Sequence, residues 1–361
     1  MSIEQAVAGT LLALLLQACA SVSAPSSHPF ERIAPEVAGY STDKLAALGA
    51  LLKDAGSDSL LLLHDGKVLF EWGNTNKKLL VHSMRKPLLN ALLGACHGEG
   101  RIHLDATLGG MGIDDDTPLT TQEKSATLRQ ILQSRSGVYL PSAAESEGMS
   151  AVRSARGSHA PGAHFYYNNW DFNVAGHIYE KFCGERIYDA FDRRIAQRVG
   201  FSDYLNRVGE VRDDSAPIDP AWDGFYKYET KLSRYPAYHF RLTAHDLARF
   251  GQLYLQRGMW EGRQLIPSSW IDLSTRPVSM VDEKYGLAYG MLWDVLVPDK
   301  GDERASFFHT GAGVHMLGVY PKHKLVLVHR VDTEAGVAFD DGNLYRIIRA
   351  VHGARIAHRV P

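Results

Sequence analysis

The sequence is poor in cysteine, in long apolar stretches and in net charge, and these absences narrow the class of protein. Its 361 residues contain only three cysteines. Cys96 and Cys183 lie in helical patterns, so we expect small buried hydrophobic side chains rather than a disulfide, and neither has the neighbours of a catalytic thiol. No apolar run reaches the ~20 residues that a membrane-spanning helix needs. The net charge of −2, without a stripe of Lys and Arg, gives no electrostatic signature of nucleic-acid binding.

The motifs of several large enzyme classes are also missing. There is no His-Glu-x-x-His and no other paired histidine spacing, so we expect no metal site and no cofactor. A Gly-x-Ser-x-Gly turn is absent, which argues against an α/β-hydrolase, and there is no phosphate-binding Gly-x-x-x-x-Gly-Lys-Ser/Thr loop. The acidic cluster at residues 114–116 is interpreted as a solvated loop.

The N-terminal 30 residues differ in composition from the rest of the chain. Residues 6–16 form a short apolar core, followed by a stretch rich in Ser, Ala and Pro, which is typical of an export signal with a flexible tether. Leu16-Gln17-Ala18-Cys19 resembles a bacterial lipoprotein cleavage box, in which Cys19 would carry the lipid and attach the protein to a membrane. The alternatives are ordinary cleavage near Ala20 or Ala24, or a start codon assigned too early. The expected location is the periplasm or cell envelope.

Three short motifs follow one another along the remaining chain and indicate nucleophilic chemistry. A serine and a lysine three residues apart lie on the same face of a helix, so the amine can take the hydroxyl proton. A serine nucleophile needs such a base when no histidine serves it. The three motifs are Ser83-Met84-Arg85-Lys86, Tyr167-Asn168-Asn169 and His309-Thr310-Gly311.

Context distinguishes the first motif from a second Ser-x-x-Lys at residues 41–44. Ser41 opens an amphipathic pattern and is interpreted as a helix N-cap. Ser83 instead follows a predicted hairpin, residues 60–70 with a turn at Asp65-Gly66, and precedes the apolar run at 88–93. A nucleophile at the start of a buried helix also gains from the helix dipole.

Together, the ordered motifs resemble the serine β-lactamase and penicillin-binding-protein superfamily, in particular the branch of class C β-lactamases, D-alanyl-D-alanine peptidases and related esterases. Longer similar stretches lie at residues 128–137, 161–176 and 243–258. The resemblance implies an α/β (α+β) fold of the β-lactamase/DD-peptidase type, an antiparallel sheet flanked by helices, with the active site at the seam with a second domain.

Strand patterns near both ends of the chain and helical patterns between them fit this arrangement. We expect residues 31–100 and 236–361 to form the α/β sheet domain, residues 101–235 to form an inserted helical domain, and residues 1–30 to be the export signal and tether.

The resemblance also implies roles for individual residues. Ser83 would be the nucleophile, Lys86 its base, and Tyr167, rather than its neighbour Tyr166, the proton shuttle to the leaving group. The implied substrate-binding residues are Asn169, His309, Thr310, Gly311 and Ala312, whose N–H would form the oxyanion hole with that of Ser83.

The predicted function is an exported serine hydrolase that acts on small esters, amides or peptides. Within this class we rank an esterase first, a D-alanyl-D-alanine carboxypeptidase second and a class C-like β-lactamase third. The alternative from another class is a catalytically silent relative that binds cell-wall peptides. We expect no nucleic-acid partner.

Overall fold

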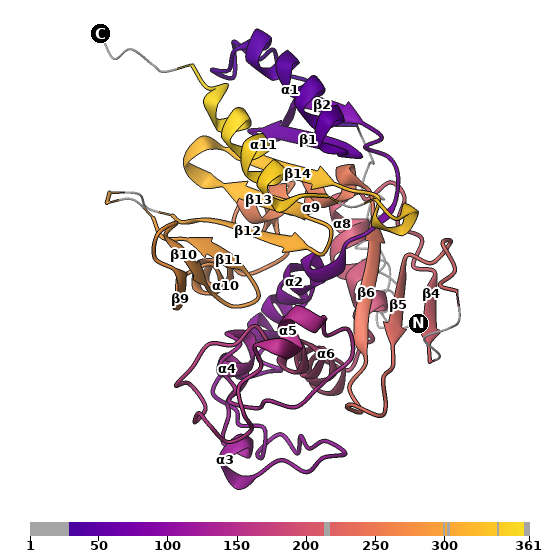
Figure 1. Ribbon diagram of the computed structural model, residues 1–361, viewed down its shortest axis with the longest axis vertical. Helices are drawn as coiled ribbons and strands as arrows, with labels where there is room; N and C mark the ends of the chain where they lie inside the picture. The colour runs from indigo at the N-terminus through magenta and orange to yellow at the C-terminus, as the bar shows by residue number, and fades with distance from the viewer. Residues whose placement is uncertain (1–28, 213–216, 299, 302–303, 338, 357–361) are drawn as a thin grey trace, which may run out of the picture.

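The computed structural model describes residues 29–212, 217–298, 300–301, 304–337 and 339–356, in which helices surround an eight-stranded sheet (Figure 1). The predicted export signal and Cys19 lie outside these residues. Every pairing in the large sheet is antiparallel, and its strands come from both ends of the described chain. In spatial order they are β2 (Lys67–Gly73), β1 (Ser59–His64), β14 (Leu325–Arg330), β13 (His315–Tyr320), β12 (Ser306–Gly311), β11 (Asp294–Leu296), β10 (Leu287–Tyr289) and β9 (Ser279–Asp282).

The centre of this sheet is buried on both faces, which explains why its strands are apolar without alternation. Side chains of a strand point alternately to the two faces. Leu60 and Leu62 of β1 belong to one hydrophobic cluster, whereas Leu61 and Leu63 belong to another. The four consecutive leucines at residues 60–63 therefore indicate a strand that is packed between two helical layers.

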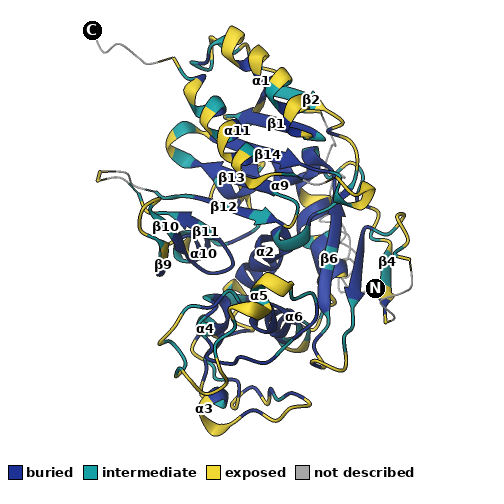
Figure 2. Cartoon of the chain, viewed as in Figure 1, coloured by how far each residue is buried: buried dark blue, intermediate teal, exposed yellow. Residues whose placement is uncertain are grey.

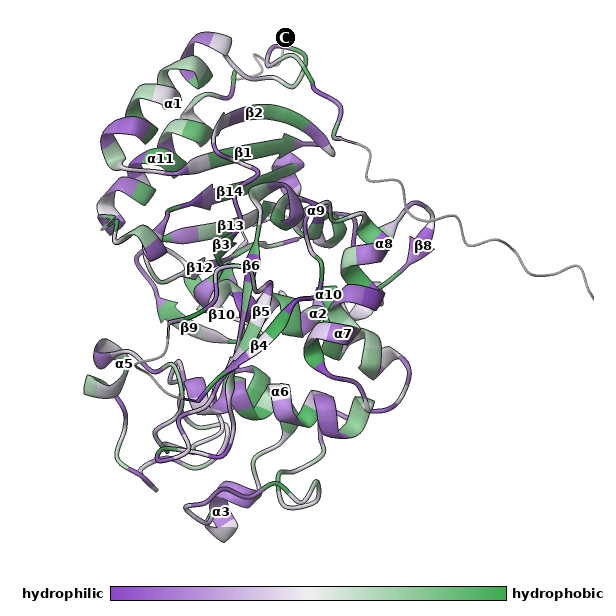
Figure 3. Ribbon diagram, turned by 90° about the vertical axis from the view of Figure 1, so that its right-hand side faces the viewer, coloured by the Kyte–Doolittle hydropathy of each residue, from purple (hydrophilic) through white to green (hydrophobic). Residues whose placement is uncertain are grey.

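Two helices cover one face of the sheet and a third covers the other. α1 (Thr42–Ala55) packs against α11 (Asp341–Gly353) on one face, and α9 (Ala244–Leu255) packs on β1, β13 and β14 from the opposite side (Figure 3). The Ser41 hydroxyl accepts a hydrogen bond from the Lys44 N–H, so the predicted N-cap of the first helix is confirmed.

A smaller sheet and a group of helices lie beside the large sheet. The small sheet has the order β3 (Leu79–Leu80), β6 (Ala237–Leu242), β5 (Gly224–Lys227) and β4 (Val208–Val211), with β4 and β5 parallel. Strand patterns are few between residues 101 and 235, because β4 and β5 are only four residues long and each contains a glycine.

The helices on this side bury the segments that carry the first two motifs. Helices α2 (Arg85–Gly98) and α6 (Asn169–Cys183) are buried along most of their length, whereas α3 (Thr121–Lys124) is largely exposed (Figure 2). Within the described residues, no helix combines the length and the apolar character needed to cross a membrane. The helices are α2 (Arg85–Gly98), α3 (Thr121–Lys124), α4 (Leu128–Leu132), α5 (Glu147–Ala151), α6 (Asn169–Cys183), α7 (Ile187–Phe191), α8 (Gln197–Val199) and α10 (Ser268–Ser274).

The expectation that Cys96 and Cys183 are unpaired was wrong, because they form a disulfide. Cys96 lies near the end of α2 and Cys183 is the last residue of α6. The two helices pack against each other, which brings the Cα atoms to 6.1 Å although 87 positions separate the residues in sequence. The sequence reveals burial of each cysteine but not this proximity.

The interpretation of the acidic cluster as a solvated loop was also wrong for its central residue. Asp115 is buried, and its Oδ2 accepts hydrogen bonds from the Trp170 indole N–H and the Ser233 hydroxyl. A buried carboxylate needs such donors. Asp115 therefore ties α6 to the segment that leads into the small sheet.

Candidate active site

Ser83 lies in a tight turn at the point where strand β3 leads into helix α2. Residues His82–Met84 form one turn of 3-10 helix, and the α-helix begins only at Arg85. Pro87 therefore falls in the first turn of α2, where a backbone N–H has no partner within the helix and proline is tolerated. His82, directly before Ser83, has a left-handed backbone with φ +48°. Its Nε2 forms a hydrogen bond with the Thr333 hydroxyl.

Lys86 is fully buried and its amine points at Ser83. The Nζ atom donates a hydrogen bond to the Ser83 Oγ over 3.0 Å. Burial, reinforced by the positive charge of Arg85, lowers the pKa of Lys86 well below its ordinary value, while Asp294 acts in the opposite direction. A lysine with a lowered pKa is available as a neutral amine, which is the form that can accept the serine proton.

Arg85 is a structural residue of this site. Its guanidinium is buried, donates hydrogen bonds to the Asn173 Oδ1 and the Tyr238 carbonyl, and lies 4.4 Å from the centre of the Tyr238 ring. These contacts fix a permanent positive charge beside Lys86. The charge supplies part of the force that keeps the lysine neutral.

The segment that carries Tyr167 is fixed from both sides by one residue, Ser134. The Ser134 hydroxyl donates to the Tyr166 carbonyl and accepts from the Asn168 N–H, and its carbonyl accepts from the Tyr166 N–H. Ser134 itself has a left-handed backbone, φ +55°. Its bonds to the residues before and after Tyr167 hold the tyrosine backbone in place.

The two adjacent tyrosines have different environments. The Tyr166 hydroxyl donates to Glu145 and to the Met149 carbonyl, away from the site. The Tyr167 hydroxyl interacts with Ser83 and lies 3.5 Å from the His309 Nε2. Burial raises the pKa of Tyr167 above its ordinary value, only partly offset by the bond with Ser83, so the phenol keeps its proton.

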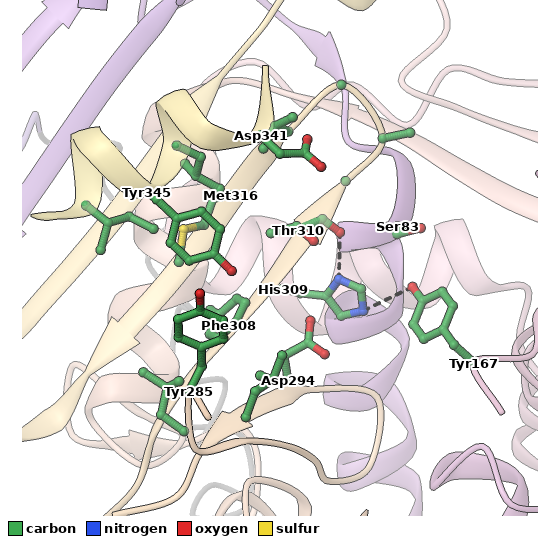
Figure 4. A pocket seen from close by; sticks show the side chains of 18 of the residues that line it. Ser83, Tyr167, Tyr285, Asp294, Phe308, His309, Thr310, Met316, Asp341 and Tyr345 are labelled. Carbon is green, nitrogen blue, oxygen red and sulfur yellow. Dashed lines mark hydrogen bonds between the residues drawn. The ribbon is translucent and has the colours of Figure 1, made fainter. Parts of the chain in front are cut away.

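His309 stands on strand β12 as a buried, neutral imidazole. Its Nδ1 lies 2.7 Å from the Thr310 carbonyl, so Nδ1 carries the proton and Nε2 faces the Tyr167 hydroxyl (Figure 4). Burial, with a smaller effect from Lys86, lowers the pKa of His309 to about 3. The ring therefore adds no positive charge to the site near neutral pH.

The end of strand β12 approaches the turn of Ser83 so closely that only glycine fits. A Cβ atom on Gly311 would lie 2.6 Å from the Val81 carbonyl oxygen and 3.1 Å from the His82 Cβ. Beyond it, Ala312 is exposed in the turn between β12 and β13. The close packing of strand β12 against the turn that carries Ser83 thus explains why position 311 is glycine.

These residues line a cavity of about 710 Å³ between strands β10–β13 and helix α11 (Figure 4). Ser83, Tyr167, the segment 309–313 and Asp294 form its polar end. The remaining wall is mostly apolar or aromatic and includes Leu287, Leu296, Phe308, Met316, Tyr320, Leu344, Tyr345 and Ile348. No residue in the described wall is a lysine or arginine.

The structure brings together the predicted residues of all three motifs except Asn169. This asparagine is buried at the start of α6, its Nδ2 donates to the Ala144 carbonyl, and it does not contribute to the cavity wall. The implied contact of Asn169 with substrate stays a prediction. Among the described residues, no group of three His, Cys, Asp or Glu side chains could hold a metal ion.

Sequence reasoning missed Asp294 and the apolar wall from α11. Asp294 is the first residue of β11 and lines the cavity beside His309. One signal could have found it, because it is the sole charged residue in the apolar stretch 290–297. The sequence of α11 does not reveal that this helix lines the cavity, because its apolar face is like that of any packed amphipathic helix.

The eight-stranded antiparallel sheet between helical layers defines a mixed α/β fold. A sequence comparison places the chain more narrowly: the β-lactamase family model matches residues 46–351. The chain therefore belongs to the β-lactamase family, and the predicted superfamily and fold class are confirmed.

Solved structures with the same fold are distant in sequence. A Bacillus anthracis protein for which 6-aminohexanoate-dimer hydrolase activity has been suggested has 20% identity and a TM-score of 0.66, with 92% of this chain and 88% of that chain covered. A penicillin-binding-protein homologue from Caulobacter crescentus has 16% identity and a TM-score of 0.60, with coverage of 88% and 99%. A class C β-lactamase has 15% identity and a TM-score of 0.62, with coverage of 86% and 95%. No curated protein matches the sequence.

Proposed function

We propose that the protein is a serine hydrolase that forms an acyl-enzyme on Ser83. The observation that carries this proposal is the 3.0 Å contact between the Lys86 amine and the Ser83 hydroxyl, at a lysine whose pKa is strongly lowered. An ordinary lysine, with a pKa near ~10.4, would be protonated at neutral pH and could not act as a base.

In the proposed reaction, the Ser83 oxygen attacks the substrate carbonyl and its proton passes to Lys86. The N–H groups of Ser83 and Ala312 would stabilise the negative oxygen of the tetrahedral intermediate. The Tyr167 hydroxyl gives its proton to the leaving group and regains one from Lys86, which restores both residues. Water then attacks the acyl group, gives its proton through the same pair and releases Ser83.

The cavity disfavours substrates that carry a carboxylate, which supports an esterase as the leading function. Its wall is mostly apolar, His309 is neutral, and the described wall contains no lysine or arginine to pair with a substrate carboxylate. D-alanyl-D-alanine peptides and β-lactams carry such a carboxylate. Amide hydrolysis remains the second candidate, since the suggested activity of the Bacillus anthracis protein is that of an amide hydrolase.

A labelling experiment and a substrate panel test the proposal. A fluorophosphonate probe should label wild type but not Ser83→Ala, with the peptide containing Ser83 carrying the adduct. The panel comprises p-nitrophenyl esters, D-Ala-D-Ala peptides and nitrocefin, of which the esters should be hydrolysed fastest. Absence of both labelling and turnover would favour the silent relative that binds cell-wall peptides.

We propose further that the protein is exported, and the Cys96–Cys183 disulfide supports this location. Structural disulfides persist in oxidising compartments such as the periplasm and are rare in the reducing cytosol. If Cys19 is lipidated, Cys19→Ser should release the protein from the membrane fraction. Ordinary secretion would be indicated instead if the mature wild-type protein began at Ser21. Its signal peptide would then be cleaved even in the presence of globomycin.

A further inference from the structure

The polar end of the cavity contains a carboxyl group that the proposed reaction does not use. Asp294 follows the buried Trp293 and begins strand β11, where it pairs with Tyr289 of β10 and Phe308 of β12. Its side chain points into the cavity beside His309 (Figure 4). The next residue, Val295, is buried in the core, so the alternation of the strand directs Asp294 toward the cavity.

This carboxyl group has no partner in the described part of the chain. Burial raises the pKa of Asp294 to about 7, and the charge of Lys86 acts in the opposite direction. No described residue donates a hydrogen bond to the carboxyl. The side chain is partly exposed at the cavity wall, so its oxygens can accept hydrogen bonds from a molecule bound there. The cavity therefore offers a carboxyl acceptor in the same wall as the nucleophile.

The other ionisable groups of the cavity do not balance this charge. Lys86 has a strongly lowered pKa, and burial lowers the pKa of His309 to about 3 and that of His352 to about 4. Asp341, at the exposed start of α11, adds a second carboxyl group to the wall. When Asp294 is ionised, the cavity is thus negative, and it matches a cation rather than an anion.

Resting on the proposed hydrolase function, we propose that Asp294 binds a protonated primary amine of the substrate and thereby makes the enzyme selective for amino-bearing esters or amides. The apolar neighbours Leu287, Leu296 and Phe308 leave room for an alkyl chain that joins this amine to the reacting carbonyl. They also exclude water, which strengthens the ion pair with Asp294. A compact ammonium with three donors suits a single carboxylate, whereas a substrate carboxylate at this place would be repelled.

Three p-nitrophenyl esters that differ only at the far end of the acyl chain test this selectivity. The acyl groups are 6-aminohexanoyl, heptanoyl and heptanedioyl, which place an ammonium, a methyl and a carboxylate at the same position. In wild type, kcat/KM should decrease in that order. Asp294→Asn should reduce the ratio of the ammonium to the methyl ester at least tenfold, whereas Asp54→Asn, which removes an exposed carboxyl on α1 outside the cavity wall, should change it less than twofold.

Competition in wild type provides a measurement that does not depend on a variant that folds. Hexylammonium should inhibit hydrolysis of the heptanoyl ester at concentrations at least tenfold lower than hexan-1-ol. A wild type that prefers the methyl ester, together with equal inhibition by amine and alcohol, would overturn the inference. So would an Asp294→Asn protein of normal thermal stability that loses the same factor on all three esters, because Asp294 would then serve Lys86 and Ser83.

Failure of the proposed hydrolase function can be recognised separately. If no ester is hydrolysed and no acyl group forms on Ser83, thermal unfolding with hexylammonium still tests the site. A rise in Tm of wild type that is absent in Asp294→Asn would retain the amine site without the hydrolase, and no rise in wild type would overturn it.

Discussion

The amine nitrogen of Lys86 lies 3.0 Å from the hydroxyl oxygen of Ser83, and the contact crosses the junction between the 3-10 turn and helix α2. Ser83 belongs to the tight turn, whereas Lys86 is the second residue of the α-helix. The turn leaves the hydroxyl at the cavity, and the helix carries the amine into the core behind it. One short segment thus exposes the nucleophile and desolvates its base.

Ser83→Ala and Lys86→Ala should each reduce ester hydrolysis by about 10³-fold or more, because the two groups act as one unit. The double variant should lose little beyond either single variant. Ser41→Ala is the matched control, since Ser41 belongs to the other Ser-x-x-Lys and only caps α1. Steady-state kinetics with a p-nitrophenyl ester measures all four. Near-normal turnover in Ser83→Ala, or an adduct on Ser41, would exclude the assignment.

Tyr167→Phe should lower kcat by about 10²-fold or more while leaving Tm almost unchanged, because only the hydroxyl that faces Ser83 is removed. Tyr166→Phe should have the opposite effects. Its hydroxyl bonds to Glu145 and Met149, so its loss should cost about 1 kcal/mol of stability and little activity. Kinetics and thermal unfolding of both variants decide which tyrosine is the proton donor.

His309→Lys should improve kcat/KM for carboxylate-bearing substrates relative to neutral esters. The native imidazole is neutral, and lysine would introduce a cation beside Tyr167 and Ser83. The ratio of nitrocefin to p-nitrophenyl acetate hydrolysis is the measurement. A wild type that hydrolyses nitrocefin far faster than any short ester at pH 7 would contradict the ranking that places the esterase first.

Reduction of the Cys96–Cys183 disulfide should lower the free energy of unfolding by about 2–4 kcal/mol, because the bond closes a long loop of the unfolded chain. The variant Cys96→Ala/Cys183→Ala should show the same lower Tm with or without dithiothreitol. Wild type should reach that Tm only in the presence of the reductant. Reaction of the Cys96 and Cys183 thiols with a thiol reagent in the unreduced, unfolded wild-type protein would show that the bond does not form.

Acidification should destabilise the protein through its buried histidines. Burial lowers the pKa of both His82 and His329 to about 4 from an ordinary value of 6.5. Below pH 6.5 the unfolded chain binds protons that the folded protein excludes, so the free energy of unfolding decreases as the pH falls from 6.5 to about 4. One such histidine should contribute about 2 kcal/mol between pH 7 and pH 5.

The variant His329→Gln tests this pH dependence. It should flatten the fall in stability between pH 7 and pH 5, measured by urea unfolding, because glutamine has no proton to gain. His103→Gln, at an exposed position, is the control and should retain the wild-type slope. An unchanged slope in His329→Gln would show that other groups cause the acid sensitivity.

The sequence by itself determined the features that depend on neighbours in the chain. The hairpin around Asp65-Gly66, the apolar run after Ser83 and the cap at Ser41 are local patterns, and the structure confirms them. The order of the three motifs was enough to predict the superfamily and an antiparallel sheet with helices. The spacing of Ser83 and Lys86 also predicted their contact, because residues three apart meet on a helical turn.

Only the tertiary structure decided the features that depend on which elements pack together. The pairing of Cys96 with Cys183 arises from the contact of α2 with α6, and the burial of Asp115 from donors contributed by distant segments. Asp294 reaches the cavity because β11 pairs with β12, which places it beside His309. Each of these contacts joins segments far apart in the chain, and local sequence patterns do not show which distant segments pack together.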